Sequence, residues 1–194
     1  MKFSSFDVYK DIHNKISPFI KSTPIITSSS INKLYDLNVY FKLELFQKTG
    51  SFKVRGALNK VLNLSDDEKN KGVVSISAGN HAQAVSWVCS LFGIKSKIVM
   101  PNNAFLSKVE ATKSYGGDVI LTRDNMMDVC NEIIDKENLT FIHPFDDYDI
   151  IRGQGTLSIE LLEDFKNIDY VFISIGGGGL ISGMSHVLKL FNPK

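Results

Sequence analysis

The ten residues QKTGSFKVRG, at positions 47–56, decide how the rest of the chain is interpreted. The aromatic and β-branched run at residues 39–45 predicts a strand before them, and residues 52–62 have the pattern of a helix. Lys53 then falls in the first turn of that helix, just after a Gly-Ser turn. Because the positive end of a helix dipole disfavours a cation, it lowers the pKa of a lysine and favours the free amine, which can form a Schiff base. A solvated surface lysine is the alternative, and Lys53 alone does not exclude it.

The composition is that of an ordinary globular protein. The chain has 194 residues, 43% hydrophobic and 22% charged, which suffices for a core in one or two domains. A net charge of +1 without a basic cluster argues against nucleic acid or a membrane as partner. Cys89 and Cys130 lie in helix-like segments without metal-ligand spacing, which predicts reduced core thiols in a cytoplasmic protein. The first residues lack the apolar stretch of a signal peptide, and no run reaches transmembrane length.

From Gly72 onward, predicted strands and helices alternate. The strands are expected at residues 73–76, 96–100, 118–121, 140–142 and 170–175. The helices between and after them are expected at residues 80–92, 105–115, 124–136 and 156–164, and after residue 179. Residues 143–155 are expected to be irregular. Short apolar strands without polar alternation indicate a parallel sheet covered on both faces, so the sequence predicts an α/β fold.

Four consecutive glycines, Gly176, Gly177, Gly178 and Gly179, separate the last predicted strand from a helix. Backbone N–H groups without neighbouring Cβ atoms can converge on an anion at a helix N-terminus, and this arrangement suits a phosphate. A tight turn would be the alternative, but two glycines would serve it. Neither G-x-G-x-x-G nor G-x-x-x-x-G-K-[ST] occurs, so the glycines predict a ligand with a single phosphate.

The residues SAGNHAQ, at positions 77–83, follow a predicted strand and open a helix. The N–H groups of this turn and the Ser77 hydroxyl can bind a second anion such as a carboxylate, and the Asn80 amide can bond to a ring hydroxyl. A lone Asn80 could also be an N-cap, and a lone His81 is more often structural. An amine, a phosphate site and a carboxylate site together are what a phosphate-bearing aldehyde cofactor needs to act on an amino acid.

The three motifs resemble those of the fold-type-II pyridoxal-phosphate enzymes: the lysine motif at 46–57, the asparagine loop at 77–83 and the phosphate loop at 176–180. Within that family the chain is similar to threonine dehydratases (threonine ammonia-lyases) and the related serine racemases, from about Lys10 to its end. The residues GQGT at 153–156 support the same group.

The resemblance also implies an architecture. It implies two parallel αβα domains of the tryptophan synthase beta-like kind, with residues 64–146 as a small substrate-side domain. Residues 1–63 and 147–194 would belong to the cofactor domain, whose C-terminal part is missing here. Family members continue past the phosphate-loop helix, so their divalent-metal site would lie beyond Lys194 and none is expected in these residues. A homo-oligomer is expected for the full-length protein.

The resemblance assigns roles to individual residues. Lys53 would bond to the aldehyde of pyridoxal 5'-phosphate and act as the catalytic base, and Asn80 would bond the 3′-hydroxyl of the cofactor. The glycines from Gly176 to Gly179 would hold its phosphate. The carboxylate of the amino-acid substrate would be bordered by Ser77, Asn80 and His81, and Gln154 could also reach it.

The implied reaction is β-elimination from L-threonine or L-serine, which gives a 2-oxo acid and ammonia. Serine racemases of this group resemble SSGNH at the asparagine loop, where the second serine moves a proton on the face opposite the lysine. Ala78 stands at that position and carries no such proton, which favours a dehydratase over a racemase. A truncated, non-catalytic remnant that binds the cofactor, or only partner subunits, stays open as the other reading.

Overall fold

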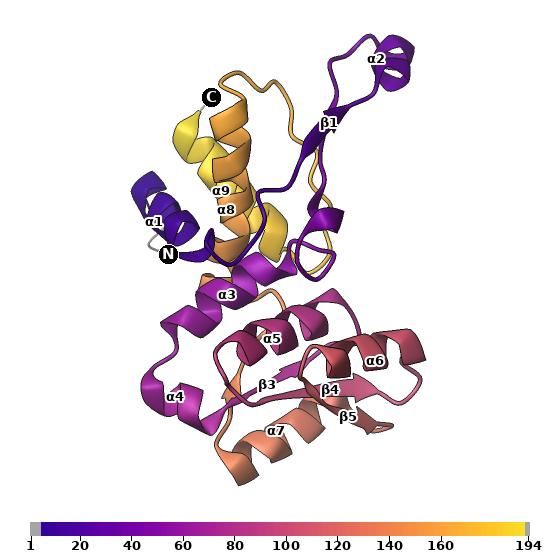
Figure 1. Cartoon of the computed structure of the whole chain (residues 1–194), viewed down its shortest axis with the longest axis vertical. Helices are drawn as coiled ribbons and strands as arrows, with labels where there is room; N and C mark the ends of the chain where they lie inside the picture. The colour runs from indigo at the N-terminus through magenta and orange to yellow at the C-terminus, as the bar shows by residue number, and fades with distance from the viewer. Residues whose placement is uncertain (1–4, 193–194) are drawn as a thin grey trace.

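The computed structural model describes residues 5–192, and a four-stranded parallel sheet forms one half of it (Figure 1). The strand order is β5-β4-β3-β6. The strands are β3 (Val73–Ile76), β4 (Ser96–Pro101), β5 (Asp118–Thr122) and β6 (Thr140–Phe141). Helices α5 (Asn80–Leu91) and α6 (Leu106–Ser114) lie on one side of the sheet, and α7 (Met126–Glu137) lies on the other. The predicted alternation of strands and helices is confirmed here, with ends that differ by one or two residues.

Both faces of this sheet are buried, which explains why its strands lack polar alternation. Val73 packs in the cluster that contains α5, and its neighbour Val74 packs in the cluster that contains α7. Successive side chains of a strand point to opposite faces, so two covered faces require apolar residues at both positions. Cys89 in α5 and Cys130 in α7 are buried free thiols, as predicted.

Helices make up most of the other half: α1 (Phe6–Ile16), α3 (Lys53–Asn63), α8 (Tyr148–Asp164) and α9 (Gly179–Phe191). Glycines allow these helices to approach closely. A Cβ on Gly153 would lie 2.6 Å from the Cα of Gly56 on α3, and a Cβ on Gly183 of α9 would overlap the carbonyl oxygen of Ile151 on α8. Within residues 5–192 no helix is long and apolar enough to cross a membrane.

The start of α8 corrects the prediction that residues 143–155 are irregular. The helix begins at Tyr148, where the Asp147 side chain accepts hydrogen bonds from the N–H groups of Asp149 and Ile150. An aspartate in this position is a strong helix N-cap. Gly153 and Gly155 lie inside the helix and provide the close contacts with its neighbours.

A projecting arm precedes the lysine motif (Figure 1). It contains β1 (Ile25–Thr27), α2 (Ser29–Tyr35) and β2 (Tyr40–Lys42), and β1 pairs antiparallel with β2. The strand predicted at 39–45 is therefore shorter than expected, because a 3₁₀ turn, η1 (Glu44–Phe46), replaces its second half. The short helix α4 (Asp66–Lys71) is capped at its N-terminus by a capping box between Ser65 and Glu68, and it leads into the parallel sheet.

The strand predicted at residues 170–175 is not formed. The segment is extended, but no strand among the described residues pairs with it. Its apolar side chains are open to solvent, with Tyr170 82%, Phe172 96% and Ile175 71% exposed. A strand is defined by the hydrogen bonds of a neighbour, so an apolar β-type sequence without one remains an extended segment.

A buried group of four charged side chains joins the arm to the helices. The Arg55 guanidinium, fully buried, donates to Glu44 Oε1 at 2.8 Å and to Glu160 Oε1 at 2.7 Å, and Lys42 Nζ lies 2.6 Å from Glu160 Oε2. Burial alone would raise the pKa of Glu160, but hydrogen bonds from Arg55 and Lys42 outweigh it and lower that pKa. We call these residues the Arg55 ion cluster; they connect β2, η1, α3 and α8.

Candidate active site

Lys53 is the first residue of α3, as predicted, and its side chain is half-buried. Its Nζ donates a hydrogen bond to the carbonyl oxygen of Pro144 at 2.7 Å. Burial lowers the pKa of Lys53, because the charged ammonium loses water. The position of Lys53 at a helix start predicted the same direction through the helix dipole, but in the structure the cause is desolvation. Lys53 is therefore a partly desolvated amine rather than a solvated surface lysine.

The Ser77 turn connects β3 to α5. Ser77 N donates to the carbonyl oxygen of Val99, and Ser77 Oγ accepts from Gly79 N at 3.1 Å. Asn80 is the first residue of α5, and Gly79 occupies the N-cap position. The Asn80 side chain is exposed and makes no hydrogen bond within the described residues, so it does not act as a cap. Its amide is open to a ligand.

His81 is buried beneath the same turn. Its Nε2 lies 3.4 Å from the carbonyl oxygen of Ile142, and its Nδ1 has no hydrogen-bond partner among residues 5–192. Burial, together with the nearby charge of Lys53, lowers the pKa of His81 to about 3. The imidazole is therefore neutral at ordinary pH, and it lies close enough to Lys53 for the two groups to interact electrostatically.

A short segment after β6 connects these parts; the sequence predicted an irregular stretch here but no role at the site. His143 Nδ1 accepts hydrogen bonds from Phe145 N at 3.2 Å and Asp146 N at 2.7 Å. These bonds close a turn that directs the Pro144 carbonyl to Lys53. The preceding residue, Ile142, accepts a hydrogen bond from buried Ser75 of β3. The only sign of this segment in the sequence was a proline in a polar stretch.

The four glycines lie against the same segment. A Cβ on Gly177 would overlap the Phe145 ring, and a Cβ on Gly179 would lie 3.0 Å from the Phe145 carbonyl oxygen. Gly178 has φ +90°, a conformation that side-chain-bearing residues rarely adopt. A Cβ on Gly176 would meet nothing within 4 Å. The loop therefore leaves free space at Gly176 and at the N-terminus of α9, and rests on the residue that follows Pro144.

Gln154 lies on α8, buried against α3. Its Oε1 accepts from the backbone N of Gly56 at 3.3 Å, and its Nε2 has no hydrogen-bond partner in the part of the chain that the structure describes. This contact is three residues after Lys53 on α3.

In the described residues, no group of three or more His, Cys, Asp or Glu side chains could hold a metal ion.

Comparison with known proteins identifies the family. Residues 16–194 match the family described as pyridoxal-phosphate dependent enzyme. The chain is 46% identical over 182 residues to the catabolic L-threonine dehydratase TdcB of Staphylococcus aureus strain N315, covering 92% of this chain and 53% of that protein. The chain thus spans about half the length of the curated relatives it matches.

Solved structures agree with this assignment. The fold is similar to that of maize serine racemase, with a TM-score of 0.94 and 40% identity over 98% of this chain and 59% of that one. It is also similar to threonine deaminase isoform 2 of Solanum lycopersicum, with a TM-score of 0.90 and 37% identity over 97% and 53% of the two chains. Lys53 lies near His81, which follows the Ser77 turn, and its hydrogen-bond partner Pro144 precedes Phe145, which contacts the glycine loop. The chain belongs to the family of pyridoxal-phosphate dependent enzymes.

Proposed function

We propose that this chain carries the catalytic lysine and the phosphate loop of an enzyme that removes the β-hydroxyl of L-threonine or L-serine, releasing a 2-oxo acid and ammonia. One observation carries the proposal: the Lys53 amine, with its pKa lowered by burial, donates to the carbonyl of Pro144 and lies near His81. His81 follows the Ser77 turn, and Phe145, the residue after Pro144, contacts the glycine loop. The 46% identity to a threonine dehydratase supports this choice of reaction.

The residues around Lys53 fit pyridoxal 5'-phosphate. The glycine loop has N–H groups at the start of α9 and free space beside Gly176, which suits a phosphate. The unpaired Asn80 amide suits a ring hydroxyl. When bound, this cofactor supplies an electron sink that stabilises negative charge at the substrate Cα.

The side chains of this chain would then move and place the proton. Lys53 Nζ, as a neutral amine, takes the Cα proton as general base, because it is held in place and its pKa is lowered toward the working pH. Ser77 Oγ already accepts from Gly79 N, so its proton is free to donate to the substrate carboxylate. His81 borders this position as a neutral ring.

Racemisation is less well supported. A racemase needs a second acid or base on the face of Cα opposite the lysine. Ala78, in the turn between Ser77 and Gly79, carries only a methyl group. This difference favours elimination over racemisation, although serine racemases are among the similar structures.

The architecture and setting of the whole protein also belong to this proposal. We propose that residues 64–146 form the small substrate-side domain and that residues 1–63 and 147–194 belong to the cofactor domain. The full-length enzyme would be a homo-oligomer. The buried, unpaired thiols Cys89 and Cys130 support a reducing compartment such as the cytoplasm.

The decisive experiment is an assay with the cofactor added. The purified chain should form a visible absorbance band with pyridoxal phosphate and a borohydride-stable adduct at Lys53. A version extended by the C-terminal half of the staphylococcal dehydratase should release 2-oxobutanoate from threonine, at roughly 10 per second or less. The chain alone should be at least about tenfold slower, or about 1.4 kcal/mol in the barrier. A cofactor band without turnover in the extended protein would indicate a remnant, and an adduct elsewhere would refute the role of Lys53.

A further inference from the structure

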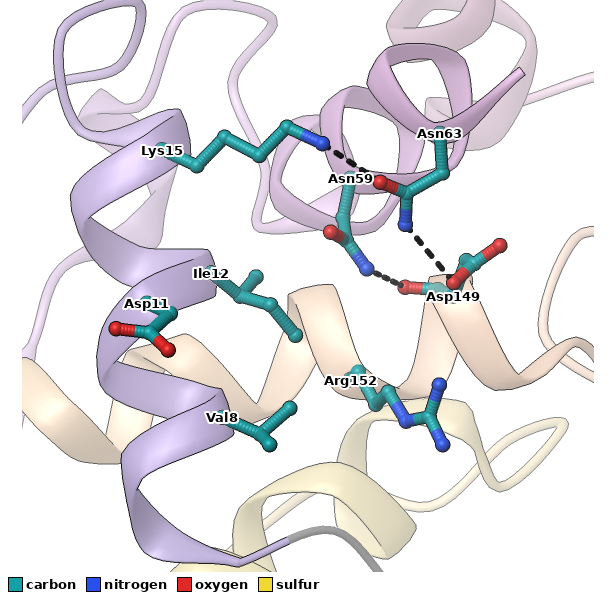
Figure 2. A pocket seen from close by; sticks show the side chains of 8 residues that line it. All are labelled: Val8, Asp11, Ile12, Lys15, Asn59, Asn63, Asp149 and Arg152. Atoms are coloured by element: carbon teal, nitrogen blue, oxygen red, sulfur yellow. Dashed lines mark hydrogen bonds between the residues drawn. The ribbon is translucent and has the colours of Figure 1, made fainter. Parts of the chain in front are cut away.

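A cavity of about 240 Å³ lies between α1, α3 and α8 (Figure 2). Val8 and Ile12 extend from α1 toward α8, Asn59 of α3 lies above Ile12, and Arg152 of α8 forms a third side. Asn59 is six residues after Lys53, so it lies about 9 Å further along the α3 axis. No residue of this cavity takes part in the proposed reaction.

Asn59 has an unused hydrogen-bond acceptor at this cavity. Its side chain is only 1% exposed, and its Nδ2 donates to the carbonyl oxygen of Asp149 at 2.7 Å, which fixes the orientation of the amide. The Oδ1 atom therefore points the other way, toward α1, and has no hydrogen-bond partner among the described residues (Figure 2). A buried acceptor without a partner costs about 1–3 kcal/mol. The site thus lacks an N–H or O–H donor.

The neighbouring groups indicate which donor would fit. One turn further along α3, Asn63 Oδ1 accepts from the ammonium of Lys15 at 2.6 Å, so the chain already places an alkylammonium group on an adjacent amide. Asp11, at the rim, forms no ion pair or hydrogen bond within residues 5–192. The acceptors without a partner at this end of the cavity are thus Asn59 Oδ1 and the Asp11 carboxylate, and Val8 and Ile12 provide an apolar wall.

We propose that this cavity binds a small aliphatic compound that carries a protonated amine. Its ammonium donates to Asn59 Oδ1, its carbon chain packs on Val8 and Ile12, and Asp11 adds a favourable charge at the rim. Lys15 covers Asn59 from outside; as an exposed side chain it can move aside on a nanosecond timescale.

Two sources share this chemistry, a simple amine and an amino acid. Arg152 lies over the Tyr148 ring, 5.8 Å from its centroid, and forms no ion pair with any carboxylate that the structure describes. The guanidinium is therefore available to the carboxylate of an amino acid. A simple amine would leave it unused.

The test uses three probes: butylammonium, which carries only an amine, butyrate, which carries only a carboxylate, and L-valine, which carries both. The readout is the Ile12 δ-methyl signal in an NMR titration, which reports binding without any assay of activity. Butylammonium should shift this signal saturably and butyrate should not. If L-valine binds tighter than butylammonium, and Arg152→Met removes the difference, the ligand is an amino acid; equal binding indicates a simple amine.

Two variants show whether the cavity itself is responsible. Val8→Phe fills the cavity from a position that is 38% exposed, and should weaken binding at least about tenfold. Met127→Phe makes a similar change at a 39% exposed position on α7 and should have no effect. The titrations are repeated on the extended protein, so association of the short chain does not decide the result. Absence of a saturable Ile12 shift up to roughly 50 mM amine, far above a millimolar dissociation constant, would overturn the proposal.

Discussion

The Ser77 turn and the glycine loop both lead into helices, and they are supported in different ways. The Ser77 turn follows β3, which is hydrogen-bonded to β4 on one side and β6 on the other. The glycine loop follows an extended segment that has no strand partner within residues 5–192. It is held by α9 and by the fit of Gly177 and Gly179 on Phe145. Two equally distinctive motifs can therefore have very different structural support.

The largest expected effect comes from removing the Lys53 amine. Lys53→Ala should lower 2-oxo acid release by at least about 1000-fold in the extended protein, because it removes the general base. Unfolding free energy should change by only about 1 kcal/mol, since the side chain is half-buried and part of its burial is unfavourable. Lys48→Ala, at a nearby exposed lysine, is the matched control. A Lys53→Ala protein that keeps a borohydride-stable cofactor adduct would contradict the assignment.

Acid should act on the Ser77 turn through His81. The pKa of buried His81 is about 3, below its ordinary value. As the pH falls below about 6.5, His81 is therefore protonated in the unfolded chain but stays neutral in the folded chain. The free energy of unfolding should therefore fall with a slope that approaches about 1.4 kcal/mol per pH unit from this residue, or about 2 kcal/mol in all between pH 6.5 and 4.5. Urea unfolding at several pH values measures it. The variant His81→Gln should have a shallower dependence, and equal slopes would refute the explanation.

Phe145→Ala should affect the glycine loop alone. Without the ring, Gly177 loses the surface on which it rests, whereas the Phe145 atoms next to Gly179 remain in alanine. The affinity of the loop for the cofactor phosphate should fall about tenfold, equivalent to about 1.4 kcal/mol. Phe141→Ala is the control, since Phe141 also packs edge-on against the His143 ring but lies in β6. Cofactor titration followed by absorbance separates the two variants. Equal losses of affinity would show that the loop does not depend on Phe145.

The smallest expected effect is a change of product at the Ser77 turn. Ala78→Ser introduces a hydroxyl next to Ser77 and should raise D-serine formation from L-serine several-fold while elimination still predominates. Chiral chromatography of the products, beside a 2-oxo acid assay, gives the ratio. Comparable rates of racemisation and elimination in the unchanged protein would show that Ala78 does not set the outcome.

The parallel sheet was predictable from sequence because each of its elements carries its own local signal. Buried apolar runs such as 73–76 are strands when helices cover both faces, and Gly93 and Gly116 take positive φ values where helices end. Lys53 could be placed at a helix start for the same reason. The cause of the lowered pKa of Lys53 could not be predicted in this way, because desolvation depends on residues that are far away in sequence.

Other features depend on contacts that no local pattern contains. Glycine is unfavourable inside a helix. At Gly153 and Gly155, however, the lack of a side chain allows α8 to approach α3 and α9. Residues 170–175 have the composition of a strand but lack a partner to pair with. The contact of Phe145 with the glycine loop joins residues more than thirty positions apart, and its role appears only in three dimensions.

The Arg55 ion cluster has a consequence for the effect of ionic strength. Mobile ions screen charges over about 8 Å at physiological ionic strength, but only where they can approach them. Arg55 is fully buried and Glu160 nearly so, whereas pairs such as Lys136 and Glu132 are open to solvent. Added salt should weaken the open pairs and leave the cluster intact. The orientation of the helix that carries Lys53 should therefore persist in concentrated salt, even where surface charge pairs no longer contribute.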